Sequence, residues 1–391
     1  MKRVVITGIG ALTPLGNSFK ESWQGLINGN SGIAEYRDLL KTPYLAGRLK
    51  DYDPLKYMSA KELNRLDPFA QYALAASHMA IVDASLTLSL EQQSAVIIGS
   101  SRGGIMLIEQ ACGSASKRTS PYLMPATTIS MAASYIAQTF RLRGHCLGIS
   151  NACSSGANAV GEGYRLIKDG YASLVICGGT DAPISKVCLM GYKSSKVMSR
   201  GISCRPFDRD RDGFILSEGA CVMMLEGLDH AIKRGAEIYA EIIGYVNSTD
   251  GVSPVRPDFD GQVMAMKAAL NQSGLQAQDI DLINAHAAST KIGDVVEADA
   301  INNLFGKTPV TANKSATGHM LAASGAFEIA ATSASIKYSV IPPTINIENL
   351  DPRCDINVII KKIDTPTTIA LSNSFGFGGL NSVIVLKEFI M

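Results

Sequence analysis

The sequence has almost no net charge and no long apolar run. Its 36 Lys and Arg residues nearly balance 35 Asp and Glu residues, so no chain-wide basic field exists to hold nucleic acid or an anionic membrane. No apolar run approaches the roughly 20 residues needed to cross a bilayer. The apolar stretch near Met1 is also too short for a signal peptide, and we therefore expect a cytoplasmic protein that binds neither nucleic acid nor membrane.

Paired cysteines are also missing. None of the eight cysteines forms a C-x-x-C pair, and their scatter along the chain matches neither a zinc site nor a disulfide framework, so we expect no metal. Only five histidines are present. The 46% hydrophobic composition, with 18% charged residues and 36 glycines, describes an ordered globular chain with many tight turns.

Short β-branched runs, each followed by Gly or Ser and then by an amphipathic stretch, predict an α/β fold. The pattern runs once through residues 1–228 and starts again in residues 229–391, with no flexible linker between, which predicts two halves that share an interface. In the first half we expect strands at 4–9, 95–99, 146–150, 174–178 and 221–226, and helices at 61–83 and 156–169. In the second half we expect strands at 237–245, 280–285, 368–372 and 382–386, and helices at 262–273, 294–304 and 318–338.

Three stretches resemble ligand-binding motifs but do not complete them. Residues 8–13 begin like a dinucleotide fingerprint, yet the third glycine is absent and Pro14 falls where the helix should run. Residues 208–213 begin like a calcium loop but lack its terminal carboxylate, so we interpret them as a solvated Arg/Asp turn. Residues 99–104 lack the ending of a phosphate loop and are interpreted as a turn after a strand.

Cys153 stands between a predicted strand and a predicted helix, in the sequence Asn-Ala-Cys-Ser-Ser-Gly. This arrangement resembles a nucleophile elbow, and the following small residues permit close packing. The start of a helix lowers the pKa of a thiol, because the helix dipole favours the thiolate. A buried structural cysteine is the competing interpretation, and Cys153 alone does not decide between them.

Two of the five histidines stand in informative positions. His286 ends a predicted strand, where open α/β sheets place their ligands. His319 follows Lys-Ser-Ala-Thr-Gly and precedes a run of small residues. For a single histidine, a structural role is the more common outcome, and we assign that role to the other three.

Together these motifs resemble the β-ketoacyl-acyl carrier protein synthases of the elongating Cys-His-His type. The resemblance rests on Cys153 in its elbow, His286 in Asn-Ala-His-Ala-Ala-Ser-Thr, and Lys314 and His319 in Lys-Ser-Ala-Thr-Gly-His. It includes Arg-Pro-Phe-Asp at 205–208 and Phe-Gly-Phe-Gly-Gly near the end, and it covers the whole chain in order. It implies a thiolase-like fold, a five-layered α/β/α/β/α sandwich of two similar halves, usually dimeric.

The resemblance also implies a mechanism. The Cys153 thiolate would take an acyl chain from an acyl carrier protein, and the backbone amides of Cys153 and Phe377 would form the oxyanion hole. Neutral His286 and His319 would stabilise the enolate formed when malonyl carrier protein loses carbon dioxide. Lys314, with Glu328 as its candidate partner, would order the site. No cofactor is expected beyond the phosphopantetheine of the carrier, and Phe377 would act as a gate between flexible glycines.

The sequence departs from the family where the pantetheine arm binds. Ala288, Val252 and Leu380 replace the usual threonines, so standard hydrogen bonds to the arm are lost. We retain Ser253 and Thr290 as expected contacts. Two further groups of positions carry over from the family: Phe375, Gly376 and Gly378 at the substrate, and Lys61, Arg65 and Arg205 for docking of the acidic carrier protein.

These departures leave the pathway open between a type II polyketide or polyene ketosynthase and a divergent fatty acid synthase. The partner is then a second copy of the chain or a ketosynthase-like chain-length factor. The alternative function is a catalytically silent chain-length subunit, which usually lacks the nucleophile, whereas Cys153 is present here. A degradative thiolase would need a catalytic cysteine in the Gly-rich turn, where this chain has Phe375 and Phe377.

Overall fold

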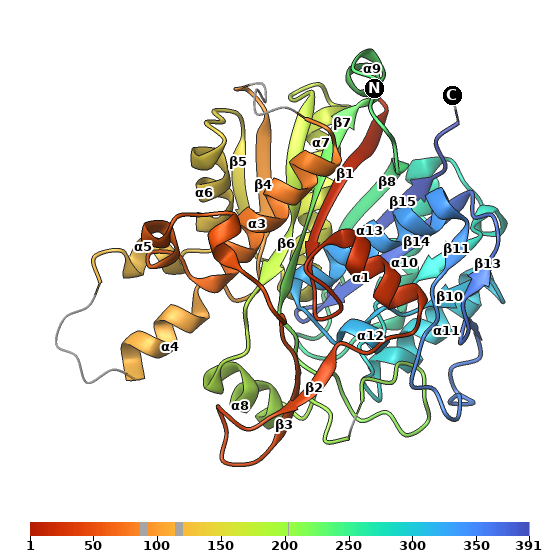
Figure 1. The fold of residues 1–391 in the computed structure, drawn as a ribbon. Helices are drawn as coiled ribbons and strands as arrows, with labels where there is room; N and C mark the ends of the chain where they lie inside the picture. Colours follow the sequence, from red (N-terminus) through yellow and green to blue (C-terminus); the bar gives the residue numbers. More distant parts are fainter. Residues whose placement is uncertain (87–91, 114–119, 202, 391) are drawn as a thin grey trace.

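The computed structural model describes residues 1–86, 92–113, 120–201 and 203–390 (Figure 1). Its main feature is a mixed sheet of eleven strands in the order β12-β10-β9-β14-β15-β8-β1-β7-β6-β4-β5. The strands of the first half are β1 (Val4–Leu12), β4 (Ala95–Gly99), β5 (Cys146–Ile149), β6 (Leu174–Asp181) and β7 (Gly219–Gly227). Those of the second half are β8 (Ala240–Thr249), β9 (Leu282–Asn284), β10 (Pro309–Thr311), β12 (Asn357–Val358), β14 (Ile369–Gly376) and β15 (Leu380–Lys387).

The strands of the two halves meet at one short ladder. Residues Val4 to Ile6 of β1 pair antiparallel with Ile242 to Ala240 of β8 and join the two groups into one sheet. The sequence predicted a shared interface but not this hydrogen-bonded junction. The chain passes from β7 to β8 through α9 (Leu228–Lys233).

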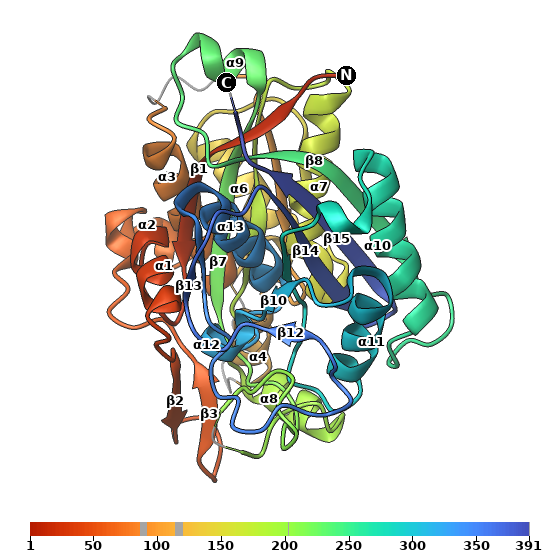
Figure 2. The same cartoon turned by 90° about the vertical axis from the view of Figure 1, so that its right-hand side faces the viewer.

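Helices form the outer and central layers of the molecule (Figure 2). The central helices α7 (Ser155–Lys168) and α13 (Ala322–Tyr338) contact each other and strands of both halves. On the outside, α3 (Pro68–Asp83) packs on β1, β6 and β7, while α10 (Phe259–Ser273) packs on β8 and β15. The expected five-layered α/β/α/β/α arrangement is therefore confirmed.

Small residues allow the central layer to pack closely. A Cβ added to Gly156 of α7 would lie 2.1 Å from the carbonyl oxygen of Ala322, at the start of α13. A Cβ at Gly161 would lie 2.2 Å from the ring of Tyr245, on β8. Neither position has room for a side chain, because real Cβ atoms do not approach other atoms so closely. The small residues of α7 therefore allow the segment that carries Cys153 to pack against the segment that follows His319.

Two predicted helices differ from the structure. The helix expected at 61–83 is two helices, α2 (Ala60–Leu63) and α3, because Asp67 caps a new start with Pro68 at its first position. The helix expected at 318–338 begins at Ala322, since Gly318 and Leu321 have φ angles of 69° and 51°. His319 therefore lies in a turn before the helix.

The remaining elements surround this framework. Among the described residues, no helix has the length and apolar character to span a membrane. The elements are α1 (Phe19–Ile27), β2 (Ile33–Tyr36), β3 (Tyr44–Gly47), α4 (Ile105–Gly113), α5 (Leu123–Thr127), α6 (Met131–Thr139), α8 (Lys186–Ser194), α11 (Gly293–Phe305), α12 (Lys314–Thr317), β11 (Val340–Ile341) and β13 (Ile363–Asp364), with 3₁₀ turns at Pro54–Lys56, Ala152–Ser154 and Ala277–Asp279.

Candidate active site

Cys153 lies in a strained turn between β5 and α7. Ala152 has a φ of 48°, which is unfavourable for a residue with a side chain. Its carbonyl oxygen accepts hydrogen bonds from the hydroxyls of Ser101 and Ser155, both at 2.6 Å. These bonds hold the turn in place, and Cys153 is only partly buried, which matches the predicted elbow.

Both predicted histidines come from distant parts of the chain: His319 reaches the thiol directly, and His286 packs against His319. The Nε2 of His319 lies 3.1 Å from Cys153 Sγ, and the His286 ring lies edge-on to the His319 ring, with centroids 5.5 Å apart. Ser324 Oγ accepts the Met320 amide hydrogen and lies 3.2 Å from His319 Nδ1. The hydroxyl hydrogen of Ser324 is then free to bond Nδ1, which places the imidazole hydrogen on Nε2, facing the sulfur.

Lys314 lies behind His286 and is almost fully buried. Its Nζ donates to the His286 carbonyl oxygen at 2.6 Å and to Glu328 Oε1 at 2.5 Å, and lies 3.3 Å from His286 Nδ1. The candidate pairing of Lys314 with Glu328 is confirmed. Burial and then the Lys314 charge hold the pKa values of His286 and His319 well below the usual range, so both rings are neutral.

Burial dominates the ionisation of the nucleophile as well. It raises the pKa of the Cys153 thiol to about 11, although the charges of Lys314 and Arg102 and the amide of Phe377 act in the opposite direction. The lowered pKa that was expected for Cys153 from the helix start is therefore wrong. Desolvation of a thiolate here outweighs the favourable helix end.

Glu297 is a site residue that sequence reasoning missed. Its carboxylate accepts the backbone hydrogens of His286 at 2.8 Å and Ala287 at 2.7 Å, and the side-chain amide of Asn373 at 3.1 Å. Ala287 has a φ of 24° and needs such support. A carboxylate in the helix after a histidine loop was the available signal, and it was overlooked.

Asp181, at the end of β6, was also missed. Its buried carboxylate accepts hydrogen bonds from the Ser100 hydroxyl at 2.8 Å and from the amides of Ser101, Arg102 and Ala322 at 2.9 to 3.1 Å. It thus ties the turn after β4 to the start of α13. The turn at residues 99–104, predicted as a simple connection, supports the cysteine elbow through Ser101.

The Gly-rich turn lies directly against the elbow. A Cβ at Gly376 would lie 3.2 Å from both Asn151 O and Cys153 N, and the backbone amide of Phe377 donates toward the thiol. Gly378 has a φ of 89°, which favours glycine. Its amide donates to Pro254 O at 2.7 Å and attaches the turn to the loop after β8.

A cavity of about 1220 Å³ opens over these groups. Cys153, both histidines and Thr290 line it, with Phe375, Gly376 and Phe377. Ser253 is not part of this wall, and its Oγ instead accepts the Arg256 amide at 3.2 Å within a turn. Ala288 adds an apolar surface to the wall where a hydroxyl was expected, whereas Val252 is exposed.

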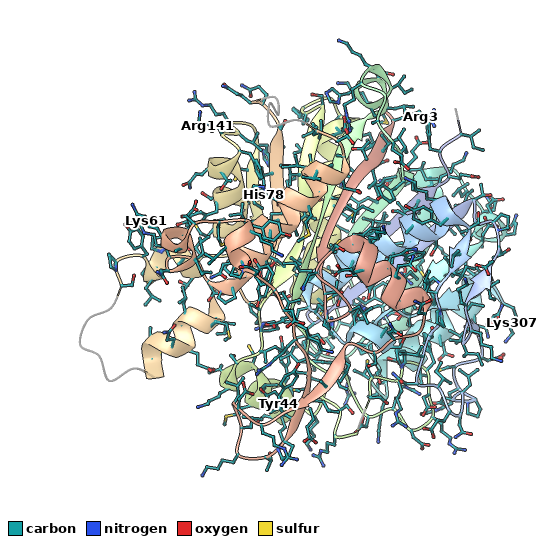
Figure 3. All side chains as sticks on the ribbon, in the orientation of Figure 1. Arg3, Tyr44, Lys61, His78, Arg141 and Lys307 are labelled. Carbon is teal, nitrogen blue, oxygen red and sulfur yellow. The ribbon has the colours of Figure 1, made fainter. Side chains whose placement is uncertain are left out.

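The predicted docking residues occupy different places. Lys61 and Arg65 are on or beside α2, and Lys61 lies far from Tyr44, which lines the cavity (Figure 3). The Arg205 side chain is only 16% exposed and lies 3.8 Å from the Asp208 carboxylate, so it is poorly placed to meet a partner. Exposed cations that the sequence reasoning missed stand around the cavity instead: Lys193, Lys196, Arg200, Arg256 and Lys291.

The Arg/Asp turn at 208–213 corrects another expectation. Asp208 and Arg211 are buried, whereas Asp210 is exposed. The prediction of a solvated turn is therefore wrong for the two buried residues, because they form hydrogen bonds with neighbouring loops. Among the described residues, no group of three His, Cys, Asp or Glu side chains is placed to hold a metal ion.

Fold and site together define a thiolase-like condensing enzyme. The family model of the β-ketoacyl synthase N-terminal domain matches residues 1–231, and the family model of the C-terminal domain matches residues 239–348. The chain therefore belongs to the β-ketoacyl synthase family, as the sequence resemblance predicted.

Similar proteins span the full chain. The 3-oxoacyl-[acyl-carrier-protein] synthase 2 of Staphylococcus aureus is 38% identical over 408 residues and covers 99% of each chain. The enzyme of the same name from Synechocystis is also 38% identical, covering 99% of this chain and 98% of its own. The solved ketosynthase/chain length factor of ishigamide has a TM-score of 0.93 at 31% identity, with full coverage of both chains.

Proposed function

We propose that this chain is a 3-oxoacyl-acyl carrier protein synthase that joins an acyl group to malonyl carrier protein by decarboxylative condensation. The observation that carries the proposal is the position of His319 Nε2, 3.1 Å from Cys153 Sγ, with His286 beside it. The proposal keeps the division of the chain at 228/229. The first half supplies the nucleophile, and the second supplies the histidines, Lys314 and the Gly-rich turn.

The first step transfers the acyl group to Cys153. Sulfur forms a bond to the thioester carbonyl carbon, and the carrier's pantetheine thiol leaves with the proton that the cysteine gives up. The exchange is proton-neutral overall, so a thiol that starts protonated is compatible with it. The amides of Cys153 and Phe377 stabilise the negative oxygen of the intermediate, and one such donor is worth about 10²- to 10³-fold in rate.

The second step forms the carbon-carbon bond. The malonyl carbon-carboxylate bond breaks, carbon dioxide leaves, and charge accumulates on the thioester oxygen. Neutral His286 and His319 donate hydrogen bonds to that oxygen, since each has its ring hydrogen on Nε2. The enolate carbon then attacks the acyl carbonyl and releases Cys153, giving a product two carbons longer.

Lys314 serves this step through its charge. The Lys314 Nζ lies 3.3 Å from His286 Nδ1 and donates to that nitrogen, and its positive charge disfavours protonation of the His286 ring. Glu328 in turn accepts from Lys314, and burial raises its pKa to about 7. The pair lets a charged lysine remain inside the protein beside two neutral rings.

We assign the carrier protein to the cavity mouth. Thr290 contacts the arm, Phe377 acts as the gate, and the five exposed cations around the cavity attract the acidic carrier. Lys61, exposed on α2, and Arg65, half-buried just after that helix, remain a secondary docking proposal. One solved relative, 28% identical with a TM-score of 0.89, is described as a type II polyketide ketosynthase in complex with its acyl carrier protein.

A second ketosynthase-like subunit is part of the proposal. The strand β5 is one of the two edge strands of the sheet, and Leu147 on it is 39% exposed, so a further strand can pair there. The partner is another copy or a chain-length factor, as in the ishigamide assembly. All eight cysteines are free thiols, which supports a reducing cytoplasm.

The test is acylation followed by condensation with purified carrier proteins. We expect acyl carrier protein to add one acyl group to Cys153, detected by intact mass and peptide mapping, and Cys153→Ala to abolish product. His286→Ala should retain acylation but lose decarboxylation. The exposed Cys112→Ala is the control. Product formed by Cys153→Ala would overturn the proposal and move the chemistry to another residue, whereas an unmodified chain that is never acylated on Cys153 would favour the silent chain-length subunit.

The same experiment separates the pathways. The acyl group found on Cys153 after copurification distinguishes a saturated fatty chain from a polyene or polyketide chain. Curated relatives with synthase 2 names favour the fatty acid pathway, and the solved polyketide assemblies favour the other. An intact nucleophile and histidine pair counts against the silent-subunit alternative.

A further inference from the structure

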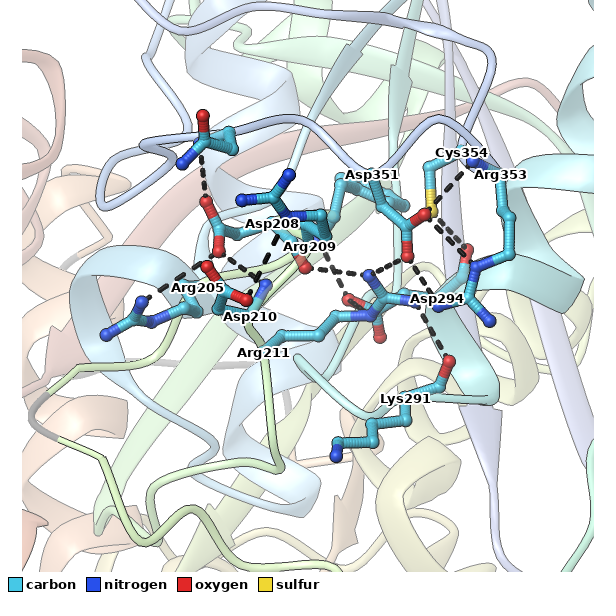
Figure 4. Close-up of polar contacts among 12 residues, drawn as sticks. Arg205, Asp208, Arg209, Asp210, Arg211, Lys291, Asp294, Asp351, Arg353 and Cys354 are labelled. Carbon is cyan, nitrogen blue, oxygen red and sulfur yellow. Dashed lines mark hydrogen bonds and ion pairs between the residues drawn. The ribbon is translucent and has the colours of Figure 1, made fainter.

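A buried ionic cluster (Figure 4) binds the backbone of Thr290 and Lys291, which line the catalytic cavity. Its centre is Arg211, whose side chain is 1% exposed. It connects three loops that are far apart in sequence, at residues 205–213, 290–294 and 351–354. Arg211 is therefore a buried charge with a defined set of acceptors, in the segment that first resembled a calcium loop.

Every nitrogen of the Arg211 guanidinium has an acceptor. Nε donates to Thr290 O at 2.9 Å and Nη2 to Lys291 O at 2.9 Å. Nη1 donates to Asp208 O at 2.7 Å and to Asp351 Oδ2 at 2.8 Å. A lysine cannot reproduce this pattern, because it has a single nitrogen instead of a planar fork.

Two of the three backbone carbonyls that Arg211 binds, those of Thr290 and Lys291, belong to the loop that follows His286. This loop contains Ser289 with a φ of 64°, a conformation that side chains disfavour. Asp294 accepts the Thr290 amide at 3.0 Å and also the amide of Phe207, so the turn is held on both sides of Thr290. The amides of Gly213 and Arg205 bind Ser289 itself, so Arg211 and Asp294 are the side chains that hold the part of the turn at Thr290 and beyond.

The loop has two separate anchors. Glu297 holds its beginning, at the backbone of His286, while Arg211 holds its later part. Thr290, Lys291 and Ile292, in that later part, line the cavity. The structure thus separates support of the reacting imidazole from support of the outer wall.

We propose that Arg211 is a positioning residue that fixes the wall of the channel for the carrier's pantetheine arm. The inference rests on the proposed function, and it goes further by assigning the ionic cluster to carrier recognition instead of chemistry. Loss of Arg211 should weaken use of carrier-bound substrates. Chemistry at Cys153 with a short substrate that lacks most of the arm should remain.

The experiment compares Arg211→Lys and Asp351→Asn with Arg353→Gln. Arg353 contacts the same Asp351 at 2.7 Å, but its side chain is 65% exposed. Both of its side-chain hydrogen bonds go to Asp351, so Arg353 is the matched control. For Arg211→Lys we expect KM for malonyl and acyl carrier proteins to rise about tenfold or more, as displaced binding groups usually cause. Asp351→Asn should give a smaller rise, and Arg353→Gln none.

Two readouts separate positioning from a general structural role. Acylation of Cys153 by an acyl-N-acetylcysteamine thioester, and its alkylation by iodoacetamide, should stay within about twofold of the unmodified enzyme, since neither needs the outer wall. Equal loss with the short and carrier-bound substrates would overturn the inference, as would an unchanged KM in folded Arg211→Lys. If that variant does not fold, Asp351→Asn decides by the same criterion.

Failure of the underlying function is a different result. An unmodified enzyme that is not acylated on Cys153 contradicts the condensing activity itself. An active enzyme whose KM for the carrier protein is unchanged by Arg211→Lys and Asp351→Asn contradicts only the proposed role of the cluster in positioning the channel wall.

Discussion

The buried pair of Lys314 and Glu328 allows a quantitative prediction. Their side chains are 1% and 2% exposed, and the charged atoms lie 2.5 Å apart. Removing one partner leaves an uncompensated buried charge, so Lys314→Met and Glu328→Gln should each lower the free energy of unfolding by about 3–5 kcal/mol. The double variant removes both charges of the pair and should lose no more than either single variant.

The surface supplies a control with the same geometry. Lys337 and Glu237 also lie 2.5 Å apart, but their side chains are 15% and 79% exposed. Solvent screens this pair, so its coupling free energy should be below about 1 kcal/mol. The buried pair should show a coupling of about 3 kcal/mol in the same double-mutant cycle.

The assay is urea unfolding followed by circular dichroism at pH 8. That pH lies above the pKa of about 7 for the Glu328 carboxyl, so the pair is ionised. All four proteins of each cycle are measured at one salt concentration. A buried coupling no larger than the exposed one would refute the reasoning that burial, and not distance, sets the strength of this pair.

Three further predictions concern the site. The rate of Cys153 alkylation by iodoacetamide should increase from pH 7 toward pH 11, because burial raises the thiol pKa to about 11. A rate that reaches its maximum near pH 7 would contradict this prediction. Gly376→Ala should lower kcat about 10²-fold by crowding the Cys153 amide 3.2 Å away, while an unchanged kcat would exclude that contact. Relative to a His286→Ala/His319→Ala double variant, the free energy of unfolding should fall as pH drops below about 6.5, because both imidazoles are held neutral in the fold but protonate when unfolded, and parallel pH profiles of the two proteins would contradict their depressed pKa values.

Much of the site was readable from local sequence. The Cys153 turn, the histidine after a strand and the Gly-rich turn each depend on a few neighbouring residues, because backbone conformation there follows small side chains and glycine. Helix limits were less predictable. Gly318 and Leu321 delay α13, and Asp67 with Pro68 divides the helix expected at 61–83.

Burial accounts for the expectations that failed. Local sequence suggested a reactive thiolate at Cys153, a solvated Arg211 and an available Arg205, yet each property depends on what other segments exclude from water. Glu297 and Asp181 escaped notice for the same reason. Most of their partners are backbone amides, so the position of Glu297 after the histidine loop was the one sequence signal for either residue.

The sequence by itself determined the alternation of strands and helices, the family, and the residue types able to do the chemistry, because these depend on short-range pattern and side-chain identity. Only the tertiary structure decided that His319 lies 3.1 Å from Cys153, and that Lys314 is buried against Glu328. Cys153 and His319 are more than a hundred positions apart in the sequence, and Lys314 and Glu328 are enclosed by several layers of the fold. The strength of these contacts comes from the exclusion of water, which no single segment achieves alone.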